Sequence, residues 1–157
     1  MSWNEQAAPW ATETRSAVYF DRTYRETMTL LVETRDYMRF LQMIAQGGEL
    51  QGVRVLKSET VALMTHNQLP PALIPIAISV GKRPGVGFGL GLSVRVESAD
   101  GDSSGRVGEY GWGGMASTHF WNSPKDDLVV VTMEQTLPFS LLLETAVKGP
   151  IYDAITK

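Results

Sequence analysis

The sequence predicts an α+β fold in which helices pack on an antiparallel sheet. Two periodicities indicate it. Apolar residues between Thr34 and Ala45 recur at helical spacing, whereas those between Phe88 and Val96 alternate with a period of two. The chain therefore divides into a helical first half and a second half that forms a sheet.

Two helices are expected in the first half. Residues 34–46 form the first, with Thr34 as its N-cap and a glycine pair at 47–48 as its end. Ser58 begins the second, which covers residues 59–67 and stops before Pro70-Pro71. The following residues 73–87, rich in proline and glycine, are expected to be an ordered connecting loop. Residues 1–30 are left unassigned.

The second half is expected to hold three strands, at residues 88–96, 115–122 and 128–135. The last of them is so apolar that an interior position in the sheet is expected rather than an edge. A C-terminal helix over residues 139–155, interrupted at Gly149-Pro150, would lie across the sheet.

The composition fits one globular domain and argues against nucleic-acid binding, disulfides, cysteine-ligated metals and membrane spans. The 157 residues carry a net charge of −3 without a basic cluster, so no nucleic-acid partner is expected. There is no cysteine, which excludes disulfides and cysteine-ligated metals, and no cofactor is expected. No apolar run reaches the length of a membrane span. The first 15 residues lack the apolar stretch of a secretory signal, which favours the cytoplasm, although a longer parent could carry a signal upstream.

The most informative segment is Trp112-Gly113-Gly114, which follows Gly111 and precedes the strand pattern at 115–122. Glycines at such a place indicate that a ligand or another backbone comes close. The segment resembles the third motif of the serine β-lactamase and penicillin-binding-protein family, Lys-Thr-Gly in lactamases and often Trp-Gly-Gly in the related esterases.

The resemblance extends over roughly residues 30–145. The segments 34–50 and 56–65 resemble the helix pair that precedes the catalytic strand in these hydrolases, and the segments 87–92 and 124–131 follow in family order. The resemblance implies that residues 31–157 are a partial domain, the C-terminal portion of a β-lactamase/transpeptidase-like fold.

The resemblance also implies roles at the glycine-rich segment. The backbone N–H of Met115 stands where the family places one donor of its oxyanion hole, and Trp112, Gly113 and Gly114 stand where the family lines its substrate groove. Trp112 replaces the lysine of lactamases, which favours the carboxylesterase branch and acyl or aryl esters. The expected substrate of the parent is a small acyl ester or amide.

The chain lacks a convincing nucleophile. The family needs a serine with a lysine one helical turn later, and only Ser79-Val80-Gly81-Lys82 has that spacing. It lies in a stretch rich in proline and glycine where no helix can form, so we interpret it as a coincidence. The chain is therefore expected to be inactive alone. Its expected partner is either an N-terminal segment that completes the domain or a second copy of the chain.

Other interpretations remain open. The chain could be a non-catalytic binding or interaction module, or a pseudoenzyme remnant, and Trp112 could belong to an ordinary glycine-kinked strand. His66 and His119 have no matched carboxylate in the sequence and are interpreted as structural. Residues 100–105 begin like a calcium loop but have glycine at position twelve, so a solvated hairpin is expected. Residues 87–91 have glycines without the strand-to-helix context of a dinucleotide site.

Overall fold

The computed structural model describes residues 34–78, 81–99 and 105–155. The chain divides into two compact units, residues 1–40 and 41–157. The described part of the first unit is the start of helix α2 (Thr34–Ala45), where the rings of Tyr37 and Phe40 stand 5.9 Å apart. The second unit holds the rest of α2 and all the elements that follow.

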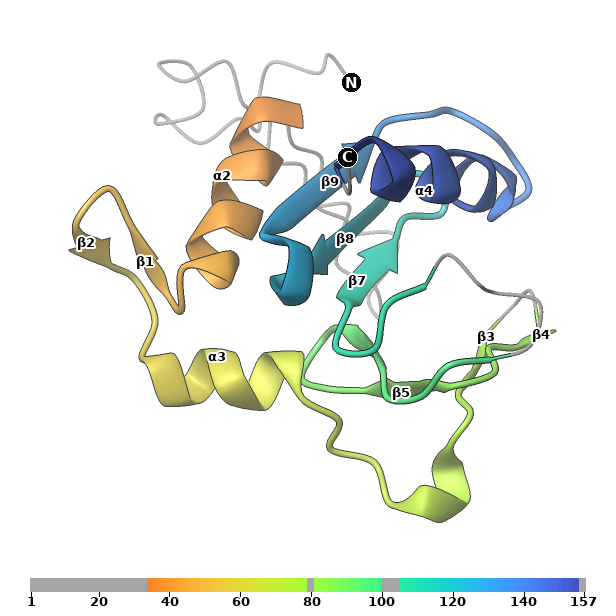
Figure 1. Ribbon diagram of the computed structural model, residues 1–157, viewed down its shortest axis with the longest axis horizontal. Helices are drawn as coiled ribbons and strands as arrows, with labels where there is room; N and C mark the ends of the chain where they lie inside the picture. Colours follow the sequence, from red (N-terminus) through yellow and green to blue (C-terminus); the bar gives the residue numbers. More distant parts are fainter. Residues whose placement is uncertain (1–33, 79–80, 100–104, 156–157) are drawn as a thin grey trace, which may run out of the picture. The chain divides into compact units, whose positions relative to one another are not determined.

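The second unit is built on a five-stranded antiparallel sheet in which each strand pairs with the next along the chain (Figure 1). The strands are β5 (Val86–Phe88), β6 (Ser93–Arg95), β7 (Tyr110–Gly113), β8 (His119–Ser123) and β9 (Leu128–Thr132). All five residues of β8 are buried, whereas all five of β9 are half-buried. The core of the sheet therefore lies along β8.

One face of the sheet carries helix α4 (Leu142–Ile155). Gly111 pairs with Trp121 in the strand register, so their side-chain positions share a face. Lys148 of α4 lies over the Trp121 ring, with 5.1 Å between its Nζ and the ring centroid. Figure 1 shows α4 running beside β7 and β8.

The opposite face packs against the second half of α2. Tyr110 pairs with Asn122 across β7 and β8, and both are buried. The side-chain amide of Asn122 donates to the carbonyl of Leu41 at 3.2 Å and to the Tyr110 hydroxyl at 3.0 Å. Because buried amide N–H groups need acceptors, these two bonds fix the second half of α2, from Leu41 onward, against the sheet.

Two small hairpins and a second helix complete the unit. Strands β1 (Glu49–Leu50) and β2 (Val53–Arg54) are joined by Gln51 and Gly52, both with positive φ as a two-residue turn requires. Helix α3 (Ser58–Thr65) follows, and then the short 3₁₀ helix η2 (Pro71–Leu73). Strands β3 (Ala77–Ile78) and β4 (Gly81–Lys82) form the second hairpin. The segment 73–87 is thus not only a loop, because it holds this hairpin and the start of β5.

The single strand expected at residues 88–96 is wrong, because the chain turns back on itself there. Strands β5 and β6 pair antiparallel, with Phe88 opposite Ser93. The turn is closed by the N–H of Gly89, which donates to the carbonyl of Leu92 at 2.8 Å, and Gly91 has a φ of 82°. A side chain at Gly89 would lie 2.0 Å from the carbonyl oxygen of Met64. The prediction failed because the apolar residues keep alternating through the turn, as they would in a single strand.

The strand expected at 115–122 begins later, at His119, because the residues before it form a tight turn. The N–H of Gly114 donates to the Thr118 carbonyl at 2.7 Å, and Ser117 has a φ of 65°. Met115 therefore lies in the turn between β7 and β8 instead of in a strand.

The last two elements also differ from expectation. Strand β9 ends at Thr132, and among the described strands it has a partner only in β8, so the expected interior position is not observed. Helix α4 begins at Leu142 and continues through Pro150 without interruption. Gly149 has no Cβ to collide with the ring of Pro150, so the helix can continue through the proline.

None of the helices in the described ranges is both long and apolar enough to span a membrane. The buried apolar side chains of the second unit come from both faces of the sheet and from α2, α3 and α4. They are Leu41, Met43, Ile44, Val61, Val86, Leu92, Val94, Tyr110, Phe120, Trp121 and Tyr152.

Candidate functional site

Strand β7 extends beyond its neighbour β6 and leaves part of its backbone open. Its register with β6 covers only Tyr110 and Gly111, whereas its register with β8 continues through Trp112 and Gly113. Among the described strands, the backbone of Trp112 and Gly113 is therefore paired on one side only. The Trp112 side chain is 36% exposed and meets the ring of Phe88 edge-on, with 5.1 Å between centroids.

The three glycines of this segment face atoms of the protein itself. A Cβ at Gly111 would lie 2.2 Å from the backbone oxygen of Phe120 on β8. At Gly113 it would come within 2.9 Å of the His119 ring and 3.0 Å of the Phe139 ring. At Gly114 it would meet the Thr118 hydroxyl at 2.4 Å. Glycine is therefore required at Gly111 by the backbone of the paired strand, whereas at Gly114 only the end of the Thr118 side chain is in the way.

Met115 presents a backbone donor at the end of this edge. Its side chain is 82% exposed, and its N–H has no hydrogen-bond partner among the described residues. The turn that carries it is held by Ser117, which is fully buried. The Ser117 hydroxyl donates to the Thr136 carbonyl at 2.8 Å and accepts from the Ser140 N–H at 3.0 Å. The donor therefore sits on an anchored turn.

A cavity of about 250 Å³ lies on the α4 face of the sheet and reaches the edge at Trp112. It is lined by β6, β7, β8, the β3–β4 hairpin, the segment before α4 and α4 itself. Its lining includes Ile78, Arg83, Arg95, Trp112, His119, Phe139, Leu141, Glu144 and Lys148. The cavity thus joins apolar and aromatic walls to a set of charged side chains.

Glu109, just before β7, and Lys148 of α4 are two almost fully buried charged residues. They are 4% and 5% exposed, and Lys148 Nζ lies 2.8 Å from Glu109 Oε2. The other oxygen, Oε1, accepts from the Tyr152 hydroxyl and from the N–H of Arg106, the latter at 2.7 Å. Glu109 is therefore fully engaged and ties α4 to the start of β7.

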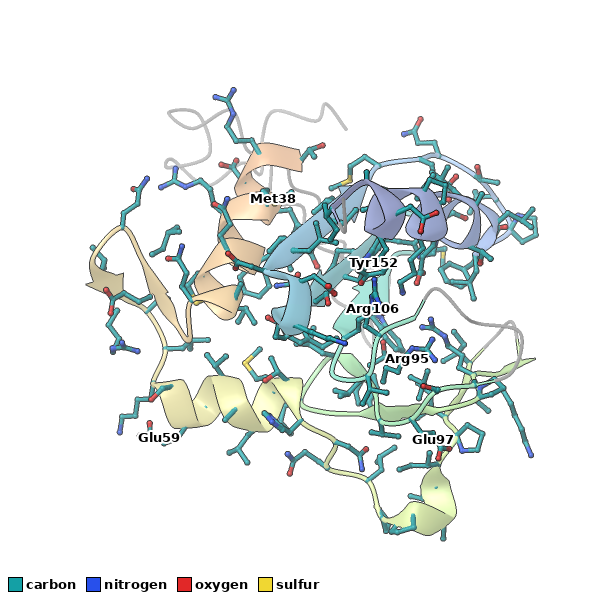
Figure 2. The ribbon with its side chains drawn as sticks, viewed as in Figure 1. Met38, Glu59, Arg95, Glu97, Arg106 and Tyr152 are labelled. Carbon is teal, nitrogen blue, oxygen red and sulfur yellow. The ribbon has the colours of Figure 1, made fainter. Side chains whose placement is uncertain are left out.

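Tyr152 is held in its neutral form by this network. Burial and the neighbouring Glu109 carboxylate raise the pKa of Tyr152 well above its usual range. The Arg106 guanidinium stacks on its ring, with 4.6 Å from Cζ to the centroid, and Figure 2 shows the two side chains side by side.

Glu144, in the first turn of α4, has three positively charged or titratable neighbours. Its carboxylate oxygens lie 3.3 Å from His119 Nδ1, 3.4 Å from Lys148 Nζ and 3.7 Å from an Arg83 guanidinium nitrogen. The other ring nitrogen of His119, Nε2, lies 2.8 Å from the Ser140 carbonyl. One carboxylate is thus shared among three groups at longer than ideal distances.

The sequence expectation that His119 lacks a matched carboxylate is wrong. Besides Glu144, Glu134 lies 3.7 Å from its Nε2. His66 has a local contact instead, with its Nδ1 2.8 Å from the carbonyl of Ala62 one helical turn back. His119 therefore belongs to the charged wall of the cavity, which we define as Glu109, His119, Glu144 and Lys148. His66 does not line the cavity.

The structure brings together Trp112, Gly113, Gly114 and Met115 along one edge, and it adds charged residues that the sequence did not single out. Glu109, Glu144 and Lys148 are the main additions. Their only sequence signal was the spacing of Glu144 and Lys148, which stand four residues apart on one helix. Ser79 and the loop 100–104 lie outside the described residues. In the described part of the chain, no three His, Cys, Asp or Glu side chains are grouped to hold a metal ion.

Comparison by sequence finds two curated relatives, both from Mycobacterium tuberculosis. Protein Rv1367c of strain H37Rv and the uncharacterized protein MT1414 of strain CDC 1551 are each 33% identical to the chain over 111 residues. The match covers 66% of this chain but 27% of each relative, so the chain spans about a quarter of their length. No family model matches the chain.

Comparison by structure finds proteins of one fold. A simvastatin synthase (LovD) mutant from Aspergillus terreus superposes with a TM-score of 0.60 at 23% identity, over 80% of this chain and 34% of that one. The unliganded selenomethionyl form of that synthase gives 0.59 at 21% identity, over 82% of this chain and 34% of that one. A candidate β-lactamase from Bacteroides dorei gives 0.50 at 22% identity, over 83% and 44%.

These neighbours are β-lactamase/transpeptidase-fold proteins, and the superpositions cover 80% and 83% of this chain. The chain therefore has a β-lactamase/transpeptidase-like fold and spans about a third of the length of the synthase that shares it.

Proposed function

We propose that the chain is the C-terminal portion of a β-lactamase-related serine hydrolase of the carboxylesterase kind. The parent would hydrolyse small acyl esters or amides through an acyl-enzyme, with the nucleophile and its lysine supplied from outside the described residues. The shared fold and the order of the matching sequence segments support this function.

The observation that carries the proposal is the unengaged N–H of Met115 beside the open edge of Trp112 and Gly113. An oxyanion donor must be fixed in place before the reaction and must not be spent on another acceptor. The anchored turn at Ser117 meets the first condition, and the Met115 N–H meets the second because it has no hydrogen-bond acceptor among the described residues. One such donor contributes about 3 to 4 kcal/mol to lowering the barrier of acyl transfer.

The aromatic corner formed by Trp112 and Phe88 supports an acyl or aryl substrate. Aromatic faces bind flat apolar groups, and the edge of β7 supplies backbone groups that can orient a carbonyl. Position 112 is tryptophan where lactamases have a lysine. Without that positive charge, neutral esters are favoured over the anionic substrates of lactamases.

The test uses a chimera, because the chain spans only about a quarter of its relatives. The matching 111 residues of Protein Rv1367c are replaced by the corresponding residues of this chain, and hydrolysis of p-nitrophenyl esters is measured beside unmodified Rv1367c. In the chimera, Met115→Pro removes the N–H and should lower kcat about 100-fold or more, whereas Met115→Ala keeps the N–H and should change it little. Equal rates for the two variants, or no hydrolysis by the chimera and its parent, would contradict the proposal.

The isolated 157-residue chain should hydrolyse neither p-nitrophenyl acetate nor nitrocefin above the uncatalysed rate. The reason is that its one Ser-x-x-Lys spacing, Ser79 to Lys82, lies in a proline- and glycine-rich stretch of sequence that does not favour the helix needed to place a nucleophile beside its lysine. Turnover by the isolated chain that disappears in Ser79→Ala would overturn this expectation and our dismissal of Ser79-Val80-Gly81-Lys82.

A further inference from the structure

His119 is a buried titratable side chain to which the proposed function gives no role. It begins β8 and is 2% exposed, so its ring nitrogens need partners inside the protein. Nε2 lies 2.8 Å from the carbonyl oxygen of Ser140. Because a carbonyl oxygen can only accept, Nε2 carries the hydrogen and donates it. The Glu134 carboxylate is 3.7 Å from the same nitrogen, which is too far for a hydrogen bond.

The bond to Ser140 joins the segment after β9 to the β7–β8 turn. The backbone of Ser140 is held twice, because its carbonyl accepts from His119 and its N–H donates to the Ser117 hydroxyl at 3.0 Å. That hydroxyl donates in turn to the Thr136 carbonyl at 2.8 Å, and the Thr136 N–H donates to the Ala116 carbonyl at 3.0 Å. We call this set of bonds between residues 116–119 and 136–140 the clamp.

The ring of His119 also packs against the end of the open edge strand. A Cβ at Gly113 would lie 2.9 Å from its Nδ1 and 3.2 Å from its Cε1. The ring of Phe139 stands 5.3 Å away between centroids, and Glu144 of α4 faces Nδ1 at 3.3 Å. The imidazole is therefore held by β7, by the segment before α4 and by α4 itself, and rotation of the ring would disturb all three.

The place of the Met115 N–H depends on these contacts. Gly113, two residues before it, packs on the His119 ring, and Ser117, two residues after it, is bonded to Ser140. An oxyanion donor lowers the barrier only where it is fixed at the position of the developing charge. A displacement of about 1 Å at such a site can cost about 100-fold in rate.

We propose that His119 is a positioning residue for the Met115 oxyanion donor: its Nε2–H holds Ser140, and through Ser140 the β7–β8 turn, in the geometry of the reaction. This deepens the proposed function and rests on it. In this role His119 does not touch the reacting carbonyl, because its Nε2–H is already donated to Ser140. Glutamine is the conservative replacement, since its amide can donate near the place of Nε2, whereas phenylalanine keeps a ring and donates nothing.

The first experiment measures the clamp in the whole 157-residue chain and needs no turnover. Amide hydrogen exchange is followed residue by residue by NMR in the wild type, His119→Gln and His119→Phe. His119→Phe should speed exchange at Ser140 and Ser117 about fivefold or more, because one hydrogen bond of the clamp is lost, and His119→Gln should stay near the wild-type rates. His66→Phe is the matched control, since His66 is exposed and lies outside the cavity, and it should leave both rates unchanged.

The second experiment asks whether the clamp acts through the Met115 N–H. In the chimera with Rv1367c, His119→Phe should lower kcat for p-nitrophenyl esters about tenfold or more with KM nearly unchanged, and His119→Gln should keep most of kcat. Once Met115→Pro has removed the donor, adding His119→Phe should lower kcat little further, because two changes that act through one group are not additive. If His119→Phe does not fold, Ser117→Ala cuts the same clamp and replaces it in both experiments.

Unchanged exchange at Ser140 and Ser117 in His119→Phe would overturn this inference, and so would losses of kcat that add fully in the double variant. Equal kcat in the glutamine and phenylalanine variants would also overturn it, because the donated hydrogen bond would then make no difference. If neither the chimera nor Rv1367c hydrolyses esters, the proposed function fails and the positioning role fails with it, whatever the exchange rates. If esters are hydrolysed and the two His119 variants behave alike, only the positioning role is wrong.

Discussion

Glu109 and Lys148 form a buried ion pair, and removing either partner alone should lower the free energy of unfolding strongly. Both are almost fully buried and stand 2.8 Å apart. Lys148→Met strands the carboxylate and should lower the free energy of unfolding by about 3 to 5 kcal/mol. Adding Glu109→Gln removes the stranded charge and should recover part of that loss. Urea unfolding of the single and double variants measures this, and equal losses would speak against the pair.

Tyr152 makes stability depend on alkaline pH. Its pKa in the folded chain is raised above the ordinary value of 10.0, so the unfolded chain loses this proton first. The stabilising contribution is complete below about pH 10 and is lost as pH rises toward the folded pKa. Tyr152→Phe should therefore unfold more easily at pH 8, by about 2 kcal/mol, and show a flatter decline between pH 9 and about pH 11. Parallel curves for the two proteins would refute this.

Trp112 and Trp121 are a matched pair for separating an edge tryptophan from a core tryptophan. Trp112 is 36% exposed and Trp121 is 2% exposed. Trp121→Ala should cost about 3 to 5 kcal/mol of unfolding free energy, and Trp112→Ala well under that. In the chimera with Rv1367c, Trp112→Ala should in addition raise KM for aryl esters. A loss of stability in Trp112→Ala as large as that in Trp121→Ala would make it a core residue.

At the scale of the elements, the glycines of the β7–β8 hairpin differ in how firmly they are required. A Cβ at Gly111 would meet a backbone oxygen of the paired strand, which cannot move without breaking the ladder. A Cβ at Gly114 would meet the end of the Thr118 side chain, which can rotate away. Gly111→Ala should therefore cost about 2 to 3 kcal/mol and Gly114→Ala less than about 1 kcal/mol. Thermal unfolding followed by circular dichroism measures both, and the opposite order would contradict the packing described.

At the scale of the whole molecule, β9 is where association is expected. Its residues Leu128–Thr132 are half-buried, all but the last are apolar, and among the described strands they pair only with β8. Unpaired backbone groups on an apolar strand favour pairing with another chain. We expect a dimer, an aggregate or a complementing complex at micromolar concentration. A sedimenting monomer with slow amide exchange throughout residues 128–135 would exclude it.

The sequence by itself determined the fold class, the region of each main helix and of the last strands, and it singled out the glycine-rich segment at Trp112. These follow from local patterns, because helical and strand periodicities reflect which side of a segment is buried. The same kind of pattern predicted β5 and β6 as one strand. The apolar residues keep alternating through the turn between them, so alternation alone does not reveal that turn.

Only the tertiary structure decided the charged wall of the cavity. Glu109 and Lys148 are 39 residues apart, and His119 and Glu144 are 25 residues apart, so no spacing within one element relates them. Their contacts depend on which turn of α4 lies over which strand, and that is set by the packing of the helix on Trp121 and the sheet. Burial then makes each pairing costly to break, because a charge away from water has no other partner.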